Sequence, residues 1–387
     1  MTILAPTRDE QISQLIGTTI EQLDITDAAF DAAERCYHDL GDHLSDANAE
    51  VYVQGSFLLG TVVRPYDGDG DGDGEYDLDL VAKLDVAKTS ITQQELKDKI
   101  GDLLTDYHAD YDGVDAESPS DVSEGRRSWC LHYAGFHMDV LPCIPDASAT
   151  SDTAIELTDR ELRLWQKSDP LEYVNWFRKQ CAKQFEEERV VLSKSYGSVD
   201  AVPKHRVRTP LHRVVQILKR HRDIYFAEDH DDRPPSSLIT TLAGRSYLGE
   251  SDLLAATMGA VQRMPQHVEK RSGAYWVENP ACSGENFADK WNDYEIRRLK
   301  FERWRTAVEQ DLTGFLQETN GTVALNQRMS KAFGSAPVEQ AVKVLGARTN
   351  LAREAGNVNF ATGGLLTTAA TAKAVPSHRF FGGQADR

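Results

Sequence analysis

The stretch VYVQGSFLLGTVVRPYDGDGDGDGEYDLDLV, residues 51–81, decides the fold of this chain. Its first residues, VYV, alternate apolar and aromatic side chains as in a short β-strand, which we expect to end at Gly55 and Ser56 in a turn or helix start. An acidic, glycine-rich loop follows. Residues 76–84 then alternate polar with apolar residues, which predicts a second strand that carries Asp77 and Asp79.

The DGDGDGDG run at 67–74 invites comparison with a calcium loop. An EF-hand that began at Asp67 or Asp69 would need a glutamate at its twelfth position, and those positions hold Leu78 and Leu80. The run is therefore read most simply as a flexible surface connection. A non-enzymatic calcium-binding or scaffold protein remains the alternative from outside the enzymes.

Asp77 and Asp79 differ from the loop aspartates because residues two apart in a strand point to one face. Two carboxylates held side by side repel each other, and a divalent ion with a preference for oxygen ligands, magnesium or manganese, relieves this repulsion. Asp139 stands in another apolar strand, FHMDVLP, where a buried charge needs a reason. Gly55 and Ser56 offer backbone N–H groups and a hydroxyl to a phosphate. The structural alternative is an exposed edge strand whose acidic residues discourage pairing with the strand of another chain.

The rest of the chain predicts a mixed first part and a helical second part. A helix is expected from about Thr26, and a hairpin joins 129–133 to 136–141 through Ala134-Gly135. Helices are predicted near 171–190, 210–227, 236–247 and 293–318, and Thr209-Pro210 is a typical helix start. The Gly-, Ala- and Thr-rich tail after about Gly346 is expected to be partly mobile.

Composition limits the function classes. With 387 residues, 40% of them hydrophobic, the chain is long enough for two or three packed domains, and neither an export signal nor a membrane span is indicated. Five scattered cysteines without CxxC spacing suit a reducing cytoplasm and speak against a zinc cluster. The net charge of −18 disfavours binding of long nucleic acid, although a basic cluster lies between Lys204 and Arg222. A solvated helix face is its plainest interpretation.

The runs QGSFLLGTVVRP, EYDLDLV and FHMDVLP together resemble the polymerase-β-like nucleotidyltransferase superfamily, whose pattern is a GS turn, a [DE]x[DE] pair and a later single carboxylate. More narrowly, the chain resembles the CD-NTases, bacterial cyclic-oligonucleotide synthases related to animal cyclic GMP-AMP synthase. The blocks QILKRHRD, PPSSLITTLA and ENPACSGENFADKW are similar to segments of that family's helical half. The resemblance covers about residues 30 to 320.

This resemblance implies an α+β fold: a polymerase-β-like core of mixed sheet and flanking helices, and a helical C-terminal lobe, with the active site in the cleft. The expected domains are the core with the N-terminal helix at 1–195, the helical lobe at 196–330, and a C-terminal segment at 331–387. Asp77, Asp79 and Asp139 would hold two Mg²⁺ ions, or Mn²⁺, and carry the catalysis.

The same resemblance assigns the nucleotide. Gln54, Gly55 and Ser56 would contact the donor phosphates, Lys219 matches the family's triphosphate lysine, and Ser237 matches its partner serine, a role that Ser236 could also take. Tyr247, Tyr275, Trp276 and Trp291 are candidates for stacking on a base, although each is more often a core residue.

The implied function is synthesis of a cyclic di- or trinucleotide second messenger from ATP, GTP or both, in bacterial antiphage (CBASS) signalling. We expect a cytoplasmic monomer with no long nucleic acid and no membrane as partner, and with a regulatory protein encoded nearby. The tail motif Phe380-Phe381-Gly382-Gly383 is either a docking site or, as we favour, a hydrophobic pair tucked into the body. Other superfamily activities, RNA tailing or AMP transfer, are the enzymatic alternatives.

Overall fold

A computed structural model describes residues 7–66, 75–111, 118–159, 165–198 and 206–354, together with three short strands at 359–360, 366–367 and 373–374. The acidic loop at 67–74 and the tail motif at 380–383 lie outside these residues. The chain divides into two compact units: Leu23–Leu312 form one, and Met1–Gln22 with Thr313–Arg387 form the other. The predicted boundaries at 195 and 330 stay predictions.

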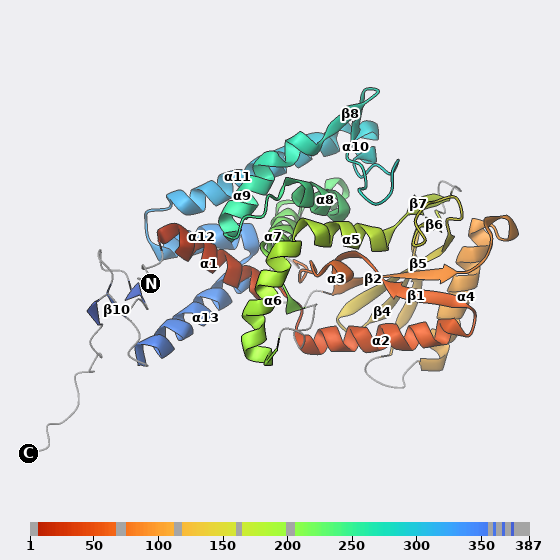
Figure 1. Cartoon of the computed structure of the whole chain (residues 1–387), viewed down its shortest axis with the longest axis horizontal. Coiled ribbons are helices and arrows are strands. Elements are labelled where there is room, and N and C mark those ends of the chain that lie inside the picture. The colour runs from red at the N-terminus through yellow and green to blue at the C-terminus, as the bar shows by residue number, and fades with distance from the viewer. Residues whose placement is uncertain are drawn as a thin grey trace, which may run out of the picture. The chain divides into compact units, whose positions relative to one another are not determined.

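The larger unit is built around a mixed sheet of seven strands (Figure 1). The main order is β1-β2-β5-β4-β3, with β6 and β7 attached beyond β5, and only the β2–β5 pair is parallel among the described strands. The strands are β1 Ala49–Val53, β2 Tyr76–Leu84, β3 Asp121–Glu124, β4 Trp129–Tyr133, β5 Phe136–Pro145, β6 Ile155–Leu157 and β7 Gln166–Ser168. The predicted hairpin is confirmed as β4–β5, with Gly135 at a φ of 94° in its turn.

One face of this sheet carries the main apolar core. Alternate residues of the central strands, such as Leu78, Leu80, Met138 and Val140, are fully buried there. Helices α2 (Asp27–Ser45) and α4 (Gln93–Tyr111) contribute to the same core, and Figure 1 shows α2 running alongside the strands. Thr26 caps α2 by accepting a hydrogen bond from the N–H of Ala29, as predicted. Because this face is filled, the polar residues of β2 and β5 are left on the other.

Among the remaining helices of the larger unit, five correspond to the four helical segments predicted from the sequence. Thr209 caps α7 and Pro210 occupies its first turn, as predicted. The expected helix at 171–190 is divided at Cys181 into α5 and α6. The bounds are α3 Gly55–Leu59, α5 Pro170–Gln180, α6 Ala182–Tyr196, α7 Pro210–Tyr225, α8 Ser236–Ser246, α9 Leu253–Arg263, α10 Asp289–Asp293 and α11 Glu295–Gln317, with the two-stranded ribbon β8 Glu269–Arg271 and β9 Ala274–Trp276.

The smaller unit begins with a helix that the sequence analysis did not predict. This helix, α1 (Arg8–Glu21), starts with a capping box between Thr7 and Glu10 and contacts α13. The other members are α12 Thr322–Phe333, α13 Ser335–Glu354 and the short strands β10 Asn359–Phe360, β11 Leu366–Thr367 and β12 Lys373–Ala374. Helix α13 continues past Gly346, so the segment expected to be mobile from that point is helical as far as Glu354.

None of the helices within the described ranges is both long and apolar enough to cross a membrane. All five cysteines lie within the described ranges, and none of them forms a disulfide bond. The cytoplasmic location stays a prediction.

Candidate active site

Strands β2 and β5 place the three predicted aspartates on one face of the sheet. In their parallel pairing, Asp79 lies directly opposite Asp139, and Asp77 lies opposite His137. Paired residues share a face, as do residues two apart in one strand, and the apolar residues between them are buried in the core on the other side. The structure therefore brings the three carboxylates together.

The three aspartates lie close together with too little positive charge around them to compensate their own. The pKa of Asp79 is raised to about 7, chiefly by burial and then by the neighbouring carboxylates of Asp139 and Asp77, against the opposing effect of Lys219. Burial also raises the pKa of Asp139, and a hydrogen bond from Cys130 works against that rise. The pKa of Lys219 is lowered to about 8, mainly by burial and then by Arg222. One partly neutralised lysine does not balance three carboxylates.

The donor set fits divalent cations of the magnesium type. Three carboxylates from two adjacent strands provide hard oxygen ligands, and a bound cation would stabilise the ionised form of Asp79 that its surroundings disfavour. The magnesium assignment remains a proposal that rests on this chemistry.

The raised pKa of Asp79 has a measurable consequence for stability. In the folded chain, Asp79 keeps its carboxyl proton up to about pH 7, whereas in the unfolded chain an ordinary aspartate loses it near pH 3.8. The free energy of unfolding therefore falls as the pH rises between these two values. In metal-free protein we expect Asp79→Asn to raise the Tm by a few degrees at about pH 8, with a gain that shrinks toward about pH 4. Thermal unfolding at a series of pH values measures this.

The matched control is Asp85→Asn, because Asp85 is exposed just after β2. This variant is expected to leave the Tm unchanged at every pH. Magnesium is expected to raise the Tm of the wild type at about pH 8 and to have a much smaller effect on Asp79→Asn. A Tm of Asp79→Asn that is lower than wild type at about pH 8 would contradict the proposed repulsion.

The turn at Gly55 lies directly against Asp79. The N–H of Gln54 donates a hydrogen bond of 2.8 Å to the carbonyl oxygen of Asp79, which holds the end of β1 against β2. Gly55 has a φ of 61°, and a Cβ atom at this position would lie 2.1 Å from Oδ2 of Asp79. Only glycine suits both the conformation and the approach. The structure therefore places Gln54, Gly55 and Ser56 beside the carboxylates.

Helix α7 brings Lys219 to the site and holds the chain that follows the Gly55 turn. Lys219 Nζ donates to the carbonyl oxygen of Thr61 at 3.1 Å. Gln216, about one helical turn before Lys219, donates from Nε2 to the carbonyl oxygen of Val62 at 2.8 Å. Arg220, next to Lys219, donates to the carbonyl oxygen of Arg64 at 3.4 Å. Positions 216, 219 and 220 share one face of the helix. Segment 61–64 is thus fixed through its backbone.

The basic cluster around α7 is not a solvated helix face, and that interpretation is wrong. Lys219, Arg220 and Arg222 are each less than a tenth exposed. Several members are paired with acidic residues of the core or of neighbouring segments, namely Arg206 with Asp27, Arg213 with Asp24, His221 with Asp311 and Arg222 with Asp223. Much of the cluster's charge is therefore used within the protein. Among its described members, only Lys219 and Arg222 reach the cavity at the site.

The two candidate serines both lie at the start of α8. Pro235 occupies the N-cap position, so neither serine caps the helix. Ser236 Oγ accepts a hydrogen bond of 2.9 Å from Arg222, and both Ser236 and Ser237 line the cavity. Ser236 and Ser237 therefore line the same cavity as Lys219.

A cavity of about 540 Å³ is lined by the Gly55 turn, Lys219 and the two serines of α8. The Gln54–Ser56 turn, Asp77 and Asp79 form one part of its wall, and residues of α5, α7 and α8 form the rest. Asp139 does not line it, although Asp139 lies beside Asp79 in the sheet. The volume is within the range typical of sites for small molecules.

Several lining residues were not predicted from the sequence. Tyr173 and Phe287 provide the aromatic surface, with their rings packed edge to face and 6.1 Å between centroids. Arg222 and Arg233 add positive charge. The four aromatic residues that were candidates for base stacking do not line this cavity, and of these Tyr247 and Trp291 are buried. Arg222 could have been found through the basic cluster; the others carry no local sequence signal.

The mixed sheet presents two neighbouring aspartates and a third on the adjacent parallel strand, beside a Gly-Ser turn, which is the arrangement expected from the resemblance to polymerase-β-like nucleotidyltransferases. Comparison with known proteins agrees with this class. Residues 17–180 match the family model of the SMODS domain, described as a Second Messenger Oligonucleotide or Dinucleotide Synthetase domain.

The similar proteins extend the match to most of the chain. A c-di-GMP synthase of Roseivirga ehrenbergii is 25% identical over 353 residues, which is 90% of this chain and 89% of that protein. The structure of the Bradyrhizobium diazoefficiens CD-NTase CdnG in complex with GTP has a TM-score of 0.69 at 18% identity and covers 87% of this chain and 99% of that one. The CdnC:HORMA-deltaN complex of E. coli MS115-1 has a TM-score of 0.58 at 14% identity, covering 83% and 96%. Residues 17–180 are thus similar to the SMODS domain, and most of the chain is similar in sequence to cyclic dinucleotide synthases and in fold to CD-NTases.

Proposed function

We propose that this nucleotidyltransferase is a cyclic dinucleotide synthase that uses magnesium and takes GTP as a substrate. The observation that carries the proposal is the alignment of Asp79 with Asp139, and of Asp77 on the same face, beside the Gly55 turn. The product and the nucleotide are supported by the similar c-di-GMP synthase of Roseivirga ehrenbergii and by the GTP complex of CdnG. ATP remains a second candidate substrate.

Each transfer joins an acceptor ribose hydroxyl to the α-phosphorus of a donor triphosphate, while the bond to pyrophosphate breaks and the hydroxyl proton leaves. Magnesium or manganese ions held by Asp77, Asp79 and Asp139 would neutralise the triphosphate and lower the cost of ionising the acceptor hydroxyl. The protein's own part is mostly to position the two reactants. Closing the ring repeats the same chemistry within one linear molecule.

The residues that line the cavity would position the reactants according to their own charge and location. Lys219 and Arg222 place positive charge on the α7 side of the cavity, where the donor phosphates would lie. Ser56 and Ser237 offer hydroxyl groups to the same phosphates, and Gly55 lets the backbone approach them. Asp139, outside the cavity wall but beside Asp79, is suited to influence the acceptor proton through its raised pKa.

A regulatory protein partner is part of the proposal. The CdnC protein of E. coli MS115-1, which has the same fold, is known in a complex named CdnC:HORMA-deltaN. We extend this by analogy to a nearby-encoded regulator for this chain, in a bacterial antiphage pathway that responds to the cyclic product. Co-expression with the neighbouring genes, followed by purification of the tagged synthase, would identify such a partner.

The central test is a product assay. Purified protein is incubated with magnesium and all four ribonucleoside triphosphates, treated with phosphatase and analysed by mass spectrometry. A cyclic dinucleotide that contains guanosine and resists phosphatase is the expected product, since a ring has no terminal phosphate. A phosphatase-sensitive linear ladder would indicate tailing, and AMP attached to protein would indicate AMP transfer; either result would overturn the proposal. The assay is run with and without the candidate partner.

A further inference from the structure

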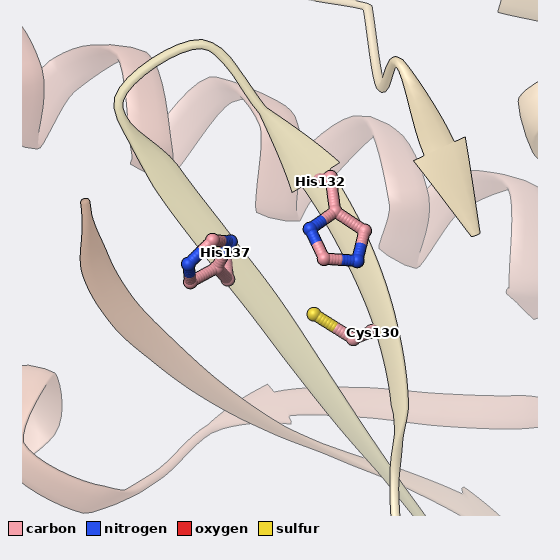
Figure 2. A group of neighbouring side chains, drawn as sticks. All are labelled: Cys130, His132 and His137. Carbon is pink, nitrogen blue, oxygen red and sulfur yellow. The ribbon is translucent and has the colours of Figure 1, made fainter. Parts of the chain in front are cut away.

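A second group of potential ligands lies on the same face of the sheet, on the β4–β5 hairpin. Cys130 pairs with Asp139 across the two strands, and His132 pairs with His137, so the side chains of these residues share a face. One ligand atom from each of Cys130, His132 and His137 lies within 4.8 Å of the others. Figure 2 shows the three side chains extending from the hairpin toward one another.

The two histidines have outer partners that would orient them as ligands. Nε2 of His137 lies 2.8 Å from a carboxylate oxygen of Glu75, and Nε2 of His132 lies 2.8 Å from Oγ of Ser123. An ionised carboxylate can only accept hydrogen bonds, so a neutral His137 ring facing Glu75 would carry its proton on Nε2 and a lone pair on Nδ1. That Nδ1 atom is buried and has no hydrogen-bond partner among the described residues. In metal-bound histidines, one ring nitrogen binds the ion while the other commonly donates its proton to an outer carboxylate.

We propose that Cys130, His132 and His137 bind a zinc-like transition-metal ion, in a set of ligands that adjoins the three aspartates and does not include them. One sulfur and two imidazole nitrogens favour Zn²⁺ over Mg²⁺, because soft and borderline ligands select such metals, whereas carboxylates select hard ions. Three protein ligands leave one position of a tetrahedral ion open. On binding, the Cys130 thiol passes its proton to the solvent and its sulfur bonds to the ion.

The sequence alone gave little reason to expect such a site. The five cysteines are scattered and lack CxxC spacing, which argues against a cluster of several thiolates. The site needs only one cysteine, and its histidines come from the same strand and from the neighbouring strand of the hairpin. The inference does not depend on the proposed synthase activity.

The test is a cobalt titration of the full chain after chelator treatment, with excess magnesium present to occupy the carboxylates. Cobalt(II) reports a sulfur ligand by a thiolate-to-metal charge-transfer band. We expect one equivalent of cobalt to saturate this band and zinc to abolish it. Cys130→Ser is expected to lose the band, and the matched control Cys282→Ser, a half-buried free cysteine elsewhere, is expected to keep it.

A second set of variants keeps the result interpretable if Cys130→Ser folds poorly. His132→Asn is expected to weaken cobalt binding strongly, and Glu75→Gln, which changes only the outer partner of His137, by about tenfold or more. Asp77→Asn is expected to retain the band, since it belongs to the other site. Absence of the band in the wild type, survival of the band in Cys130→Ser, or full affinity in His132→Asn would overturn the proposal.

Discussion

Asp77→Asn is expected to reduce product formation by at least about a thousandfold while leaving the fold intact. The substitution keeps the size of the side chain and removes one negative ligand from the three-aspartate group. Asp77 is the most exposed of the three, so its amide needs no new buried partner. The effect should therefore fall on metal and triphosphate binding and not on folding. Asp79→Asn is expected to lose activity to a similar degree.

The measurement compares the cyclic product made by wild type and by both variants in the phosphatase and mass spectrometry assay. Circular dichroism and thermal unfolding check the fold. Asp85→Asn, at an exposed position just after the same strand, is the control for a lost surface charge and is expected to keep full activity. Normal turnover by Asp77→Asn or by Asp79→Asn would refute the site.

Gly55→Ala is expected to reduce activity by about a hundredfold or more. An added methyl group would meet Oδ2 of Asp79 at 2.1 Å, so either the carboxylate or the turn must move. The φ of 61° at Gly55 also costs alanine about 1 kcal/mol or more in stability. The first effect displaces a proposed metal ligand, and the second weakens the fold.

A matched variant separates these two effects. Gly273→Ala introduces the same residue at a positive φ of 89°, in the hairpin between β8 and β9, where nothing lies within 4 Å of the new atom. Both variants are expected to lower the Tm, and only Gly55→Ala is expected to lose activity beyond the loss of folded protein. Equal activity per folded molecule in the two variants would show that the close approach to Asp79 is unimportant.

Local patterns were enough to predict much of the core. The alternation around Asp77 and Asp79, the hairpin at Gly135 and the cap at Thr209 each depend on neighbours within a few residues, and the structure confirms these elements. Helix α1 was missed although its signals are local: the Thr7 and Glu10 capping box precedes isoleucines at 12, 16 and 20, which are four residues apart and buried.

The site was predictable only where it depends on strands. The opposition of Asp79 and Asp139 follows from two adjacent strands, whereas the cavity wall comes from helices far away in the sequence. Tyr173 and Phe287 are brought together by the packing of distant segments, and no local pattern marks them. Arg213 and His221 of α7 pair with Asp24 and Asp311, which lie far away in the sequence, so composition alone cannot assign these partners.

The hydrogen bonds from α7 to segment 61–64 have a consequence for protein engineering. Gln216, Lys219 and Arg220 all donate hydrogen bonds to main-chain oxygens of that segment. These bonds depend on the position of the backbone and not on the identity of the side chains that it carries. Substitutions that keep the length of this loop and the volumes of the buried side chains of Thr61, Val62 and Val63 are accordingly expected to leave these three hydrogen bonds in place.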